Sequence, residues 1–344
     1  MTSQPRFPAE WEPQSAILIA WPHADTDWAA RLAAVEDAYI ALVAAITRFQ
    51  PVVIVVADDD VEAYAEARLR SNRVEMTRVR FVTAPYNDTW LRDTGPITLR
   101  DGDGYHLLDF RFTGWGGKFE ASQDDRLIER LIDLKLFGKI DHQAIDFALE
   151  GGAIETDGAG TLLTTWQCLH ERHPDTSRER LTERLAGWLR QDRVLWLDHG
   201  HLEGDDTDAH IDTLARFAAP DAIVFQACDD PTDSHYSGLQ AMADEIAALR
   251  TRDGQPYRLF PLPWARPIMD DGRRLAASYA NFLIINGAVL IPAYADPADA
   301  EAARVMQAAF PDRDIVPIDC RPIIWQNGSL HCLTMQLPAG LITA

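Results

Sequence analysis

The sequence predicts an α/β protein, because short β-branched runs and amphipathic stretches of helical period follow one another along it. The predicted strands are residues 15–21, 51–56, 79–82, 106–112, 161–165, 193–197, 222–226, 282–286, 288–292 and 314–318. The predicted helices are residues 27–49, 59–70, 123–137, 176–191, 237–250 and 296–310. Several of these helices are separated by two or three strands. A repeated strand–strand–helix–strand unit therefore fits the order of elements better than a single doubly wound parallel sheet.

The clearest helix start is at Asp296-Pro297. There an acidic residue precedes a proline at the first helical position, where the missing N–H removes no hydrogen bond. No low-complexity linker interrupts the chain, and the candidate chemical residues are spread from Asp93 to Cys332. We therefore expect a single domain, residues 1–344, whose centre gathers side chains from many segments.

The amino-acid composition limits the kinds of molecule that the protein is expected to bind. The 344 residues are 47% hydrophobic, enough to bury a substantial core. The 32 basic and 53 acidic side chains give a net charge of -21, which argues against nucleic acid or an anionic membrane as a partner and would attract cations. An acidic surface is also a common means of staying in solution, so the bulk charge alone does not identify a cationic ligand.

Targeting and redox signals favour a cytoplasmic protein. Residues 1–6 contain no basic segment that leads into an apolar run, and the chain has no apolar stretch long enough to span a bilayer. The four cysteines contain no C-x-x-C pair, which fits a reducing compartment and disfavours both a disulfide framework and a thiolate zinc site. Each cysteine is expected to be a free thiol.

Cys332 is the candidate nucleophile. It lies in the strand-like run 330–336, directly after Asn327-Gly328-Ser329 and beside His331. A free cysteine in an apolar strand is ordinarily a small buried hydrophobe, and Cys168, Cys228 and Cys320 are read in that way. For Cys332, neighbouring donors and a flexible backbone are expected to lower the pKa and expose the sulfur.

Two segments offer carboxylates to a cationic substrate. Asp93 follows Trp90 in a charged turn, where the indole could lie over a flat guanidinium while the carboxylate pairs with it. Taken alone, such a turn is more often purely structural. Glu150 precedes Gly151-Gly152, a pair that allows a ligand or another backbone to approach closely. Glu155, further along, is expected at the surface.

The acidic segment 204–212 contains His210 and Asp212. In an extended segment these two residues point to the same face, where one could move protons while the other holds charge. The same side chains, with His199 and His201, also permit a zinc or iron site, so a metal-dependent protein is a competing interpretation.

Taken together, the motifs resemble those of the agmatine deiminase family, guanidine-modifying enzymes with the pentein fold. The matching segments are Trp11, Trp21-Pro22, residues 87–96, 114–119, 150–152, 204–217, 278–282 and 329–336. They cover nearly the whole chain. The resemblance implies a five-bladed, pseudo-symmetric α/β propeller built of ββαβ modules around a central active site.

The resemblance also implies roles for individual residues. Cys332 would be the nucleophile and His210 the general acid and base, with Glu150 orienting His210. Asp93 and Asp212 would hold the guanidinium. Asp206 would help to receive the far amine of agmatine, and Trp90 matches the aromatic residue of the family motif.

The implied reaction is hydrolysis of agmatine to N-carbamoylputrescine and ammonia through a covalent thiouronium on cysteine. It needs no cofactor and no metal, and its partner is a small cationic guanidine compound; a homo-oligomer is possible, whereas nucleic acid and membrane are not expected. The chain departs from the family at Gln326, Asn327 and Ala209, which stand where glycines are usual.

Three alternatives remain open from the sequence. The first is a deiminase of free or peptidyl arginine, in which Arg92 or Arg216 would receive a carboxylate. The others are a metal-binding hydrolase and a non-catalytic protein that binds small cations.

Overall fold

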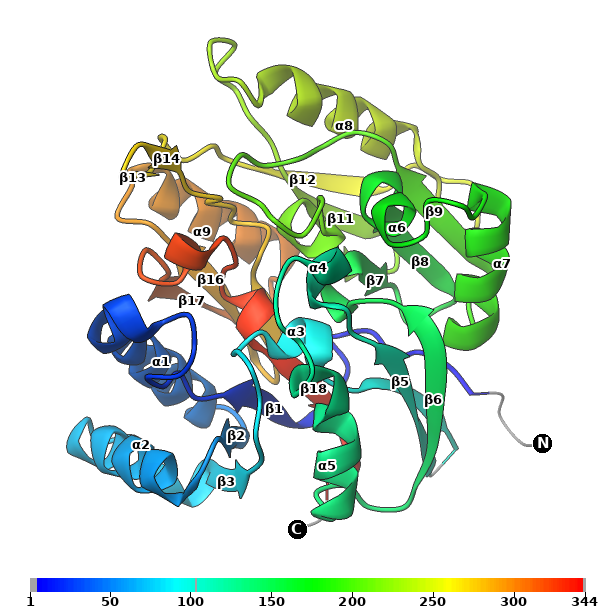
Figure 1. The fold of residues 1–344 in the computed structure, drawn as a ribbon. Coiled ribbons are helices and arrows are strands. Elements are labelled where there is room, and N and C mark those ends of the chain that lie inside the picture. Colours follow the sequence, from blue (N-terminus) through cyan, green and yellow to red (C-terminus); the bar gives the residue numbers. More distant parts are fainter. Residues whose placement is uncertain (1–4, 103, 343–344) are drawn as a thin grey trace.

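A computed structural model describes residues 5–102 and 104–342 (Figure 1), so residues 1–4, part of the segment in which no targeting signal is expected, lie outside the described range. Within that range the protein is an α/β structure of separate mixed sheets. Five sheets have three or four strands each, and one further pair, β13 (Met269–Asp270) with β14 (Arg273–Arg274), forms a small hairpin.

One sheet joins strands from both ends of the sequence, in the order β18-β1-β2-β3. Its strands are β18 (Met335–Pro338), β1 (Gln14–Ala20), β2 (Val52–Val56) and β3 (Val79–Thr83). β18 runs antiparallel to β1, with Gln14 opposite Pro338, and β2 and β3 follow in parallel. The parallel connections are made by α1 (Leu32–Thr47) and α2 (Asp59–Ser71).

The other four sheets share one pattern, in which two antiparallel strands are followed by a helix and a third strand parallel to the second. Their strands are β4 (Ile97–Asp101), β5 (Gly104–Arg111), β6 (Ile140–Ala148); β7 (Ile154–Thr156), β8 (Thr161–Thr165), β9 (Arg193–Leu197); β10 (Ala215–Ala219), β11 (Ala222–Gln226), β12 (Arg258–Leu262); β15 (Leu283–Ile285), β16 (Ala288–Ala293) and β17 (Asp314–Asp319). The helices before the third strands are α5 (Leu127–Asp133), α6 (Trp166–Arg172) with α7 (Arg178–Leu189), α8 (Tyr236–Ala248) and α9 (Ala298–Ala309). The strand–strand–helix–strand unit expected from the order of elements is therefore present in each of them.

The predicted strands and helices are found with boundaries shifted by a few residues. The sequence did not predict β6, β7, β10, β12 or α6. In β6 most positions are exposed and polar, and β12 contains Pro261, so neither shows the apolar run that identifies a buried strand. The prediction of a strand over residues 330–336 is wrong at its start. Residues His331–Leu333 form a 3₁₀ turn, and β18 begins only at Met335.

The turns that precede the first strands meet in the middle of the molecule. α3 (Leu91–Thr94), which leads to β4, contacts both the turn Gly151–Ala153 before β7 and the turn His331–Leu333 before β18. The turn Gly151–Ala153 in turn contacts Ile211–Thr213, which leads to β10. Figure 1 shows α3 near the centre of the ribbon with β18 close by. Residues far apart in sequence are thereby brought to one place.

The helices of the described residues are short or amphipathic. None of them combines the length and the apolar character that crossing a bilayer requires.

Candidate active site

Asp93 is held rigidly at the centre by groups from two other segments. Its carboxylate accepts one hydrogen bond from the Trp115 indole N–H (2.9 Å) and another from the backbone N–H of Gly152 (2.9 Å). Burial, reinforced by Asp212 and Glu150, raises the pKa of Asp93 to about 6, although nearby His210 acts in the opposite direction. Asp93 can therefore change its charge in mildly acidic solution.

His210 lies between two carboxylates, with its side chain fully buried. Nδ1 is 3.7 Å from Oδ1 of Asp93, and Nε2 is 3.7 Å from Oε2 of Glu150. Neither ring nitrogen has a hydrogen-bond partner among the described residues. Burial disfavours the imidazolium, but Asp93 and Glu150 outweigh it, so the pKa of His210 lies well above its ordinary value.

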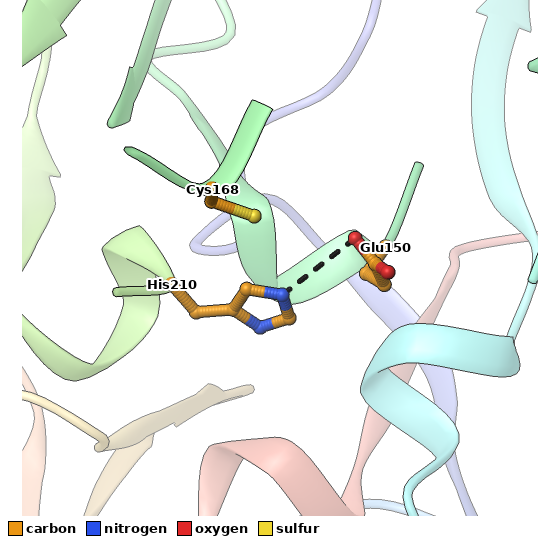
Figure 2. Close-up of side chains that lie close together, drawn as sticks. All are labelled: Glu150, Cys168 and His210. Atoms are coloured by element: carbon orange, nitrogen blue, oxygen red, sulfur yellow. Dashed lines mark ion pairs between the residues drawn. The ribbon is translucent and has the colours of Figure 1, made fainter. Parts of the chain in front are cut away.

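Glu150 is fixed by a buried guanidinium. Arg172 Nε donates to Oε1 of Glu150 (2.7 Å), which leaves Oε2 facing the imidazole of His210, as Figure 2 shows. Burial would raise the pKa of Glu150, but His210 and Arg172 lower it to about 2. Glu150 is thus an anion across the neutral range, placed where it can orient His210.

Asp212 connects the imidazole side of the site to the thiol. It is fully buried, and its Oδ2 atom is 2.7 Å from His331 Nδ1 and 3.6 Å from Cys332 Sγ. Its Oδ1 atom has no hydrogen-bond partner among the described residues. The sequence suggested that His210 and Asp212 share one face of a strand, but they do not lie in a strand. His210 instead precedes a 3₁₀ turn over Ile211–Thr213, which nevertheless brings both side chains inward.

Cys332 is 4% exposed, and its sulfur accepts a hydrogen bond from the amide Nδ2 of Asn281 at 3.2 Å. Burial favours the neutral thiol, and Asp212 and Asp93 add to that effect, so the pKa of Cys332 lies well above its usual value. The expectation that its neighbours would lower this pKa and expose the sulfur is wrong. Removal from water and two nearby anions outweigh the hydrogen bonds that the sulfur makes with the backbone of Ser329 and the side-chain amide of Asn281.

Gly152 marks the point where the central side chains converge. A Cβ atom at this position would lie 2.6 Å from His210 Nδ1, 2.8 Å from Asp93 Oδ1 and 3.2 Å from Asp212 Oδ2. Those distances leave no room for a side chain. The expectation that Gly151-Gly152 permits a close approach is therefore confirmed for both glycines, because the Arg92 backbone oxygen lies against Gly151 and the three side chains lie against Gly152.

A cavity of 660 Å³ opens above this centre. Cys332 and Asp93 border its inner end, and Trp90 and Trp115 contribute aromatic walls. The acidic residues that line it are Asp25, Asp27, Asp88, Glu120, Asp124 and Asp206. The lining also includes Lys118 and Arg273, but the Lys118 ammonium is paired with Asp208 at 2.7 Å. The acids outnumber these cations, so the cavity favours a positively charged ligand.

At the mouth of this cavity, Asp206 is hydrogen-bonded to Asn327, whose Nδ2 donates to Oδ2 at 2.7 Å. Trp90 packs against Gly328, where a Cβ atom would overlap its ring, and against Trp28, with ring centroids 5.5 Å apart. Asn327 has a φ of 73°. This left-handed conformation is natural for glycine and tolerated by asparagine.

Ala209, another departure from the family glycines, has a φ of 66° and is also left-handed. Alanine is strained in that conformation, at a cost of about 1–2 kcal/mol. The backbone at both positions therefore keeps the shape that a glycine would adopt.

One group of side chains has the composition of a metal site. Ligand atoms of Glu150, Cys168 and His210 all lie within 4.8 Å of one another, and all three residues are buried (Figure 2). The Arg172 guanidinium bonded to Glu150 opposes a further cation there. The other histidines considered for a metal site, His199 and His201, are not part of this group.

His199 is exposed and pairs with Glu245 at 2.7 Å, whereas His201 lies beside His235, with ring centroids 6.1 Å apart. The set of His199, His201, His210 and Asp212 is therefore not assembled around one point.

The two arginines considered as carboxylate receptors are buried behind the centre. Arg92 and Arg216 both contact Glu10, at 3.5 Å and 2.7 Å, and Arg216 also pairs with Glu155. Neither lines the acidic cavity. Glu155 is 6% exposed, so the expectation that it lies at the surface is wrong; its ion pair with Arg216 accounts for its burial.

Several residues of the centre were not predicted from the sequence. They are Glu10, Trp115, Cys168, Arg172, Asn281 and His331. Asn281 and Trp115 lie in segments that match the family, so the family resemblance could have identified them as site residues. Glu10 offered none, since its partners are separated from it by 206 and 321 positions.

Comparison with known proteins places the chain and its fold among the deiminases. The model of Porphyromonas-type peptidyl-arginine deiminases matches residues 6–338. The agmatine deiminase of Stutzerimonas stutzeri is 33% identical, with 99% of each chain covered. The chain therefore belongs to the family of agmatine deiminases and Porphyromonas-type peptidyl-arginine deiminases, and the resemblance seen in its motifs is confirmed.

Two solved structures illustrate the relationship. A putative arginine deiminase from Porphyromonas gingivalis is 47% identical, with a TM-score of 0.90 and coverage of 99% of this chain and 100% of that one. C. jejuni agmatine deiminase with substrate bound is 32% identical, with a TM-score of 0.90 and coverage of 98% and 97%.

Proposed function

We propose that the protein is an agmatine deiminase, a hydrolase that converts agmatine to N-carbamoylputrescine and ammonia. The observation that carries the proposal is the convergence of Cys332, His210, Asp93 and Asp212, of which Cys332 and Asp93 also line the acidic cavity. The curated relatives named agmatine deiminase, which match nearly the full chain, support it.

Binding of the guanidinium is the first step. Asp93 and Asp212 both have a carboxylate oxygen close to the Cα of Gly152. The free Oδ1 atom of Asp212 accepts a guanidinium N–H, and Asp93 receives the charge from the other side. The guanidinium keeps its proton near neutral pH, so a site that contains anions is required.

The substrate itself then activates the thiol. The two carboxylates raise the pKa of Cys332, and the bound cation offsets them, so that Cys332 loses its proton to solvent through the cavity it borders. The thiolate attacks the guanidinium carbon from about 3 to 3.5 Å. A new S–C bond forms.

His210 moves the protons of both half-reactions. As the imidazolium it protonates the leaving nitrogen, the C–N bond breaks, and ammonia departs from an S-alkylthiouronium. The neutral imidazole next takes a proton from water and the resulting hydroxide attacks the same carbon. The C–S bond then breaks to return the thiolate, and the hydroxyl proton passes to solvent as the C=O bond of N-carbamoylputrescine forms. Glu150 holds the ring in place for both steps.

The amine tail of the substrate extends toward the acidic mouth. Asp206 receives the distal ammonium, and Trp90 flanks the methylene chain. Arginine differs from agmatine by a carboxylate, and the two buried arginines near the centre are already paired with Glu10 and do not reach the cavity. The acidic mouth therefore favours agmatine over arginine.

We also propose that residues 1–344 form one catalytic unit, a five-bladed pseudo-symmetric propeller. The support is positional, because the segment before the first strand of each sheet supplies one part of the site. These segments contain Asp93 before β4, Glu150 before β7, Asp212 before β10, Asn281 before β15 and Cys332 before β18.

The test is ammonia release by the purified protein with agmatine, free arginine and an arginyl peptide as substrates. We expect agmatine to be turned over with the highest kcat/KM, and Cys332→Ala to abolish turnover. Cys228→Ala is the matched control, since Cys228 is also a buried thiol but lies outside the cavity. Ammonia release that persists in Cys332→Ala would contradict the mechanism, and faster turnover of arginine would contradict the substrate.

A further inference from the structure

Behind the thiol, a chain of buried polar groups leads from the nucleophile segment to the N-terminal segment before β1. His331 precedes Cys332, and its ring bridges two carboxylates: Nδ1 is 2.7 Å from Asp212 Oδ2, and Nε2 is 2.8 Å from Glu10 Oε2. All three side chains are at most 5% exposed. The mechanism described above uses Asp212 but neither Glu10 nor His331.

Glu10 is held in place by further groups besides the imidazole of His331. Its Oε2 atom also accepts from Arg216 Nη2 at 2.7 Å and lies 3.5 Å from Arg92. Its Oε1 atom accepts from the backbone N–H of Ile284 at 2.7 Å. A carboxylate held in this way has no rotational freedom, so it fixes the plane of the ring that donates to it.

The geometry determines which oxygen of Asp212 is available. Ionised carboxylates only accept hydrogen bonds, so each ring nitrogen of His331 must present an N–H. With both bonds made, the ring carries one positive charge between two anions. Its N–H occupies Oδ2 of Asp212, which leaves Oδ1 buried and without a partner among the residues that the structure describes.

The electrostatics agree with the geometry. Burial would raise the pKa of Asp212, but the hydrogen bond and the charge of His331 outweigh it and lower this pKa. Asp212 also stands close to Cys332 and Asp93, two groups whose anionic forms would repel its charge. The cationic neighbour offsets that repulsion.

We propose that Glu10 and His331 are positioning residues, which hold Asp212 ionised and turned so that its Oδ1 atom faces the guanidinium. This inference rests on the proposed function and extends it to a residue of the N-terminal segment. Neither residue touches the substrate. Their effect reaches the reaction only through Asp212.

The test compares two neutral substitutions of buried glutamates that share a partner. Glu10→Gln keeps the shape of the side chain but removes the charge that fixes His331. Glu155→Gln is the matched control, because Glu155 also pairs with Arg216 and is also buried but makes no hydrogen bond to His331. Both variants are checked for folding by circular dichroism and thermal melting.

We expect Glu10→Gln to lower kcat/KM for agmatine about 10- to 100-fold, mainly through KM, as is typical for loss of a charge-assisted hydrogen bond. Glu155→Gln should stay within about threefold of the parent protein. In a Cys332→Ser background, calorimetric titration should show the same loss of agmatine affinity for Glu10→Gln without any turnover. Glu10→Asp, which keeps the charge, should recover part of the loss.

Unchanged KM and kcat in Glu10→Gln would overturn the inference, and so would equal losses in the two glutamate variants. If Glu10→Gln does not fold, His331→Gln tests the same link, because the glutamine amide can still donate to Asp212 but carries no charge. Failure of the proposed function looks different, since the parent protein would then release no ammonia from agmatine.

Discussion

The inner end of the cavity and its mouth are both acidic, but they are built in opposite ways. At the inner end, Asp93, Asp212 and Glu150 are buried, and each is bound by an indole, an imidazole, a guanidinium or a backbone N–H. At the mouth, residues such as Asp25 and Asp27 are exposed and carry their charge in water.

The difference indicates a division of labour. Charges that are buried and fixed act strongly and in one direction, because water cannot screen or reorient them. Exposed acids act weakly and over a longer range, mainly by attracting a cation. The chemistry is therefore assigned to the inner end, and the choice of the substrate tail to the mouth. Changes at the inner end should accordingly have the larger effects.

The most severe effect is expected from Gly152→Ala. The new methyl group would lie within 3.2 Å of His210, Asp93 and Asp212, so all three must move. A displacement of about 1 Å at a reacting centre costs about 100-fold in rate, and we expect at least that loss in kcat/KM. Gly187→Ala is the control, because a Cβ atom there meets nothing within 4 Å. Near-normal kinetics in Gly152→Ala would contradict the close packing of the inner end.

The second prediction concerns pH and again separates the two regions. Asp93 has a pKa of about 6, so below that value it is increasingly protonated and loses its attraction for a guanidinium. Agmatine affinity of a Cys332→Ser variant should fall about tenfold per pH unit below about 6 and level off above it. Calorimetric titration between about pH 4.5 and about pH 8, at roughly half-unit steps, measures this.

The same group acts in the opposite direction on stability. Its folded-state pKa lies above the ordinary value of 3.8, so between these two values the folded state binds more protons than the unfolded chain. The contribution of Asp93 to the free energy of unfolding therefore increases as the pH falls from about 6 toward 3.8. Asp93→Asn should remove both dependences, and retention of the affinity slope in that variant would assign it to another group.

A smaller effect is expected at the mouth, from Asp206→Asn. Asp206 is partly buried, and the substitution removes its negative charge. KM for agmatine should therefore rise about tenfold while kcat stays within about twofold. Asp25→Asn, which also lines the cavity but is exposed, should change KM by less than about threefold. If the two variants behave alike, Asp206 is only one of several solvated acids.

The smallest effect is expected from Asn327→Gly. The backbone is already left-handed at this position, so glycine fits it, and the free energy of unfolding should change by less than about 1 kcal/mol. The substitution also frees Asp206 from the Asn327 amide that now donates to it. KM for agmatine should therefore fall a few-fold, and a clear rise would indicate that Asn327 orients Asp206 instead of competing with the amine.

Much of the fold could be predicted because most strands contain a β-branched run and most helices have an amphipathic pattern of helical period. The prediction missed β6 and β12, whose exposed faces or proline hide the strand signal. Short motifs of recognisable composition contain Cys332, His210 and Asp93, so these residues could be singled out from the sequence alone.

Other parts of the site could not be predicted, because they depend on contacts between distant segments. Glu10 meets His331 only in the folded molecule, and nothing near Glu10 in the sequence indicates this. The residues adjacent to Cys332 were expected to lower its pKa, whereas burial and two carboxylates remote in sequence raise it. Desolvation is a property of the whole fold and is not encoded in a local motif.

The pairing of β18 with β1 has a consequence for protein synthesis. A ribosome that has completed α9 has already made Asp93, Glu150, His210 and Asp212, yet the nascent polypeptide still lacks its sulfur nucleophile. The nucleophile is therefore added after the other residues of the site, and β1 has no partner on its β18 edge until β18 has been made. Termination of synthesis between α9 and β18 would therefore release a product that contains the other site residues but lacks Cys332, with an open sheet edge at β1 available for aggregation.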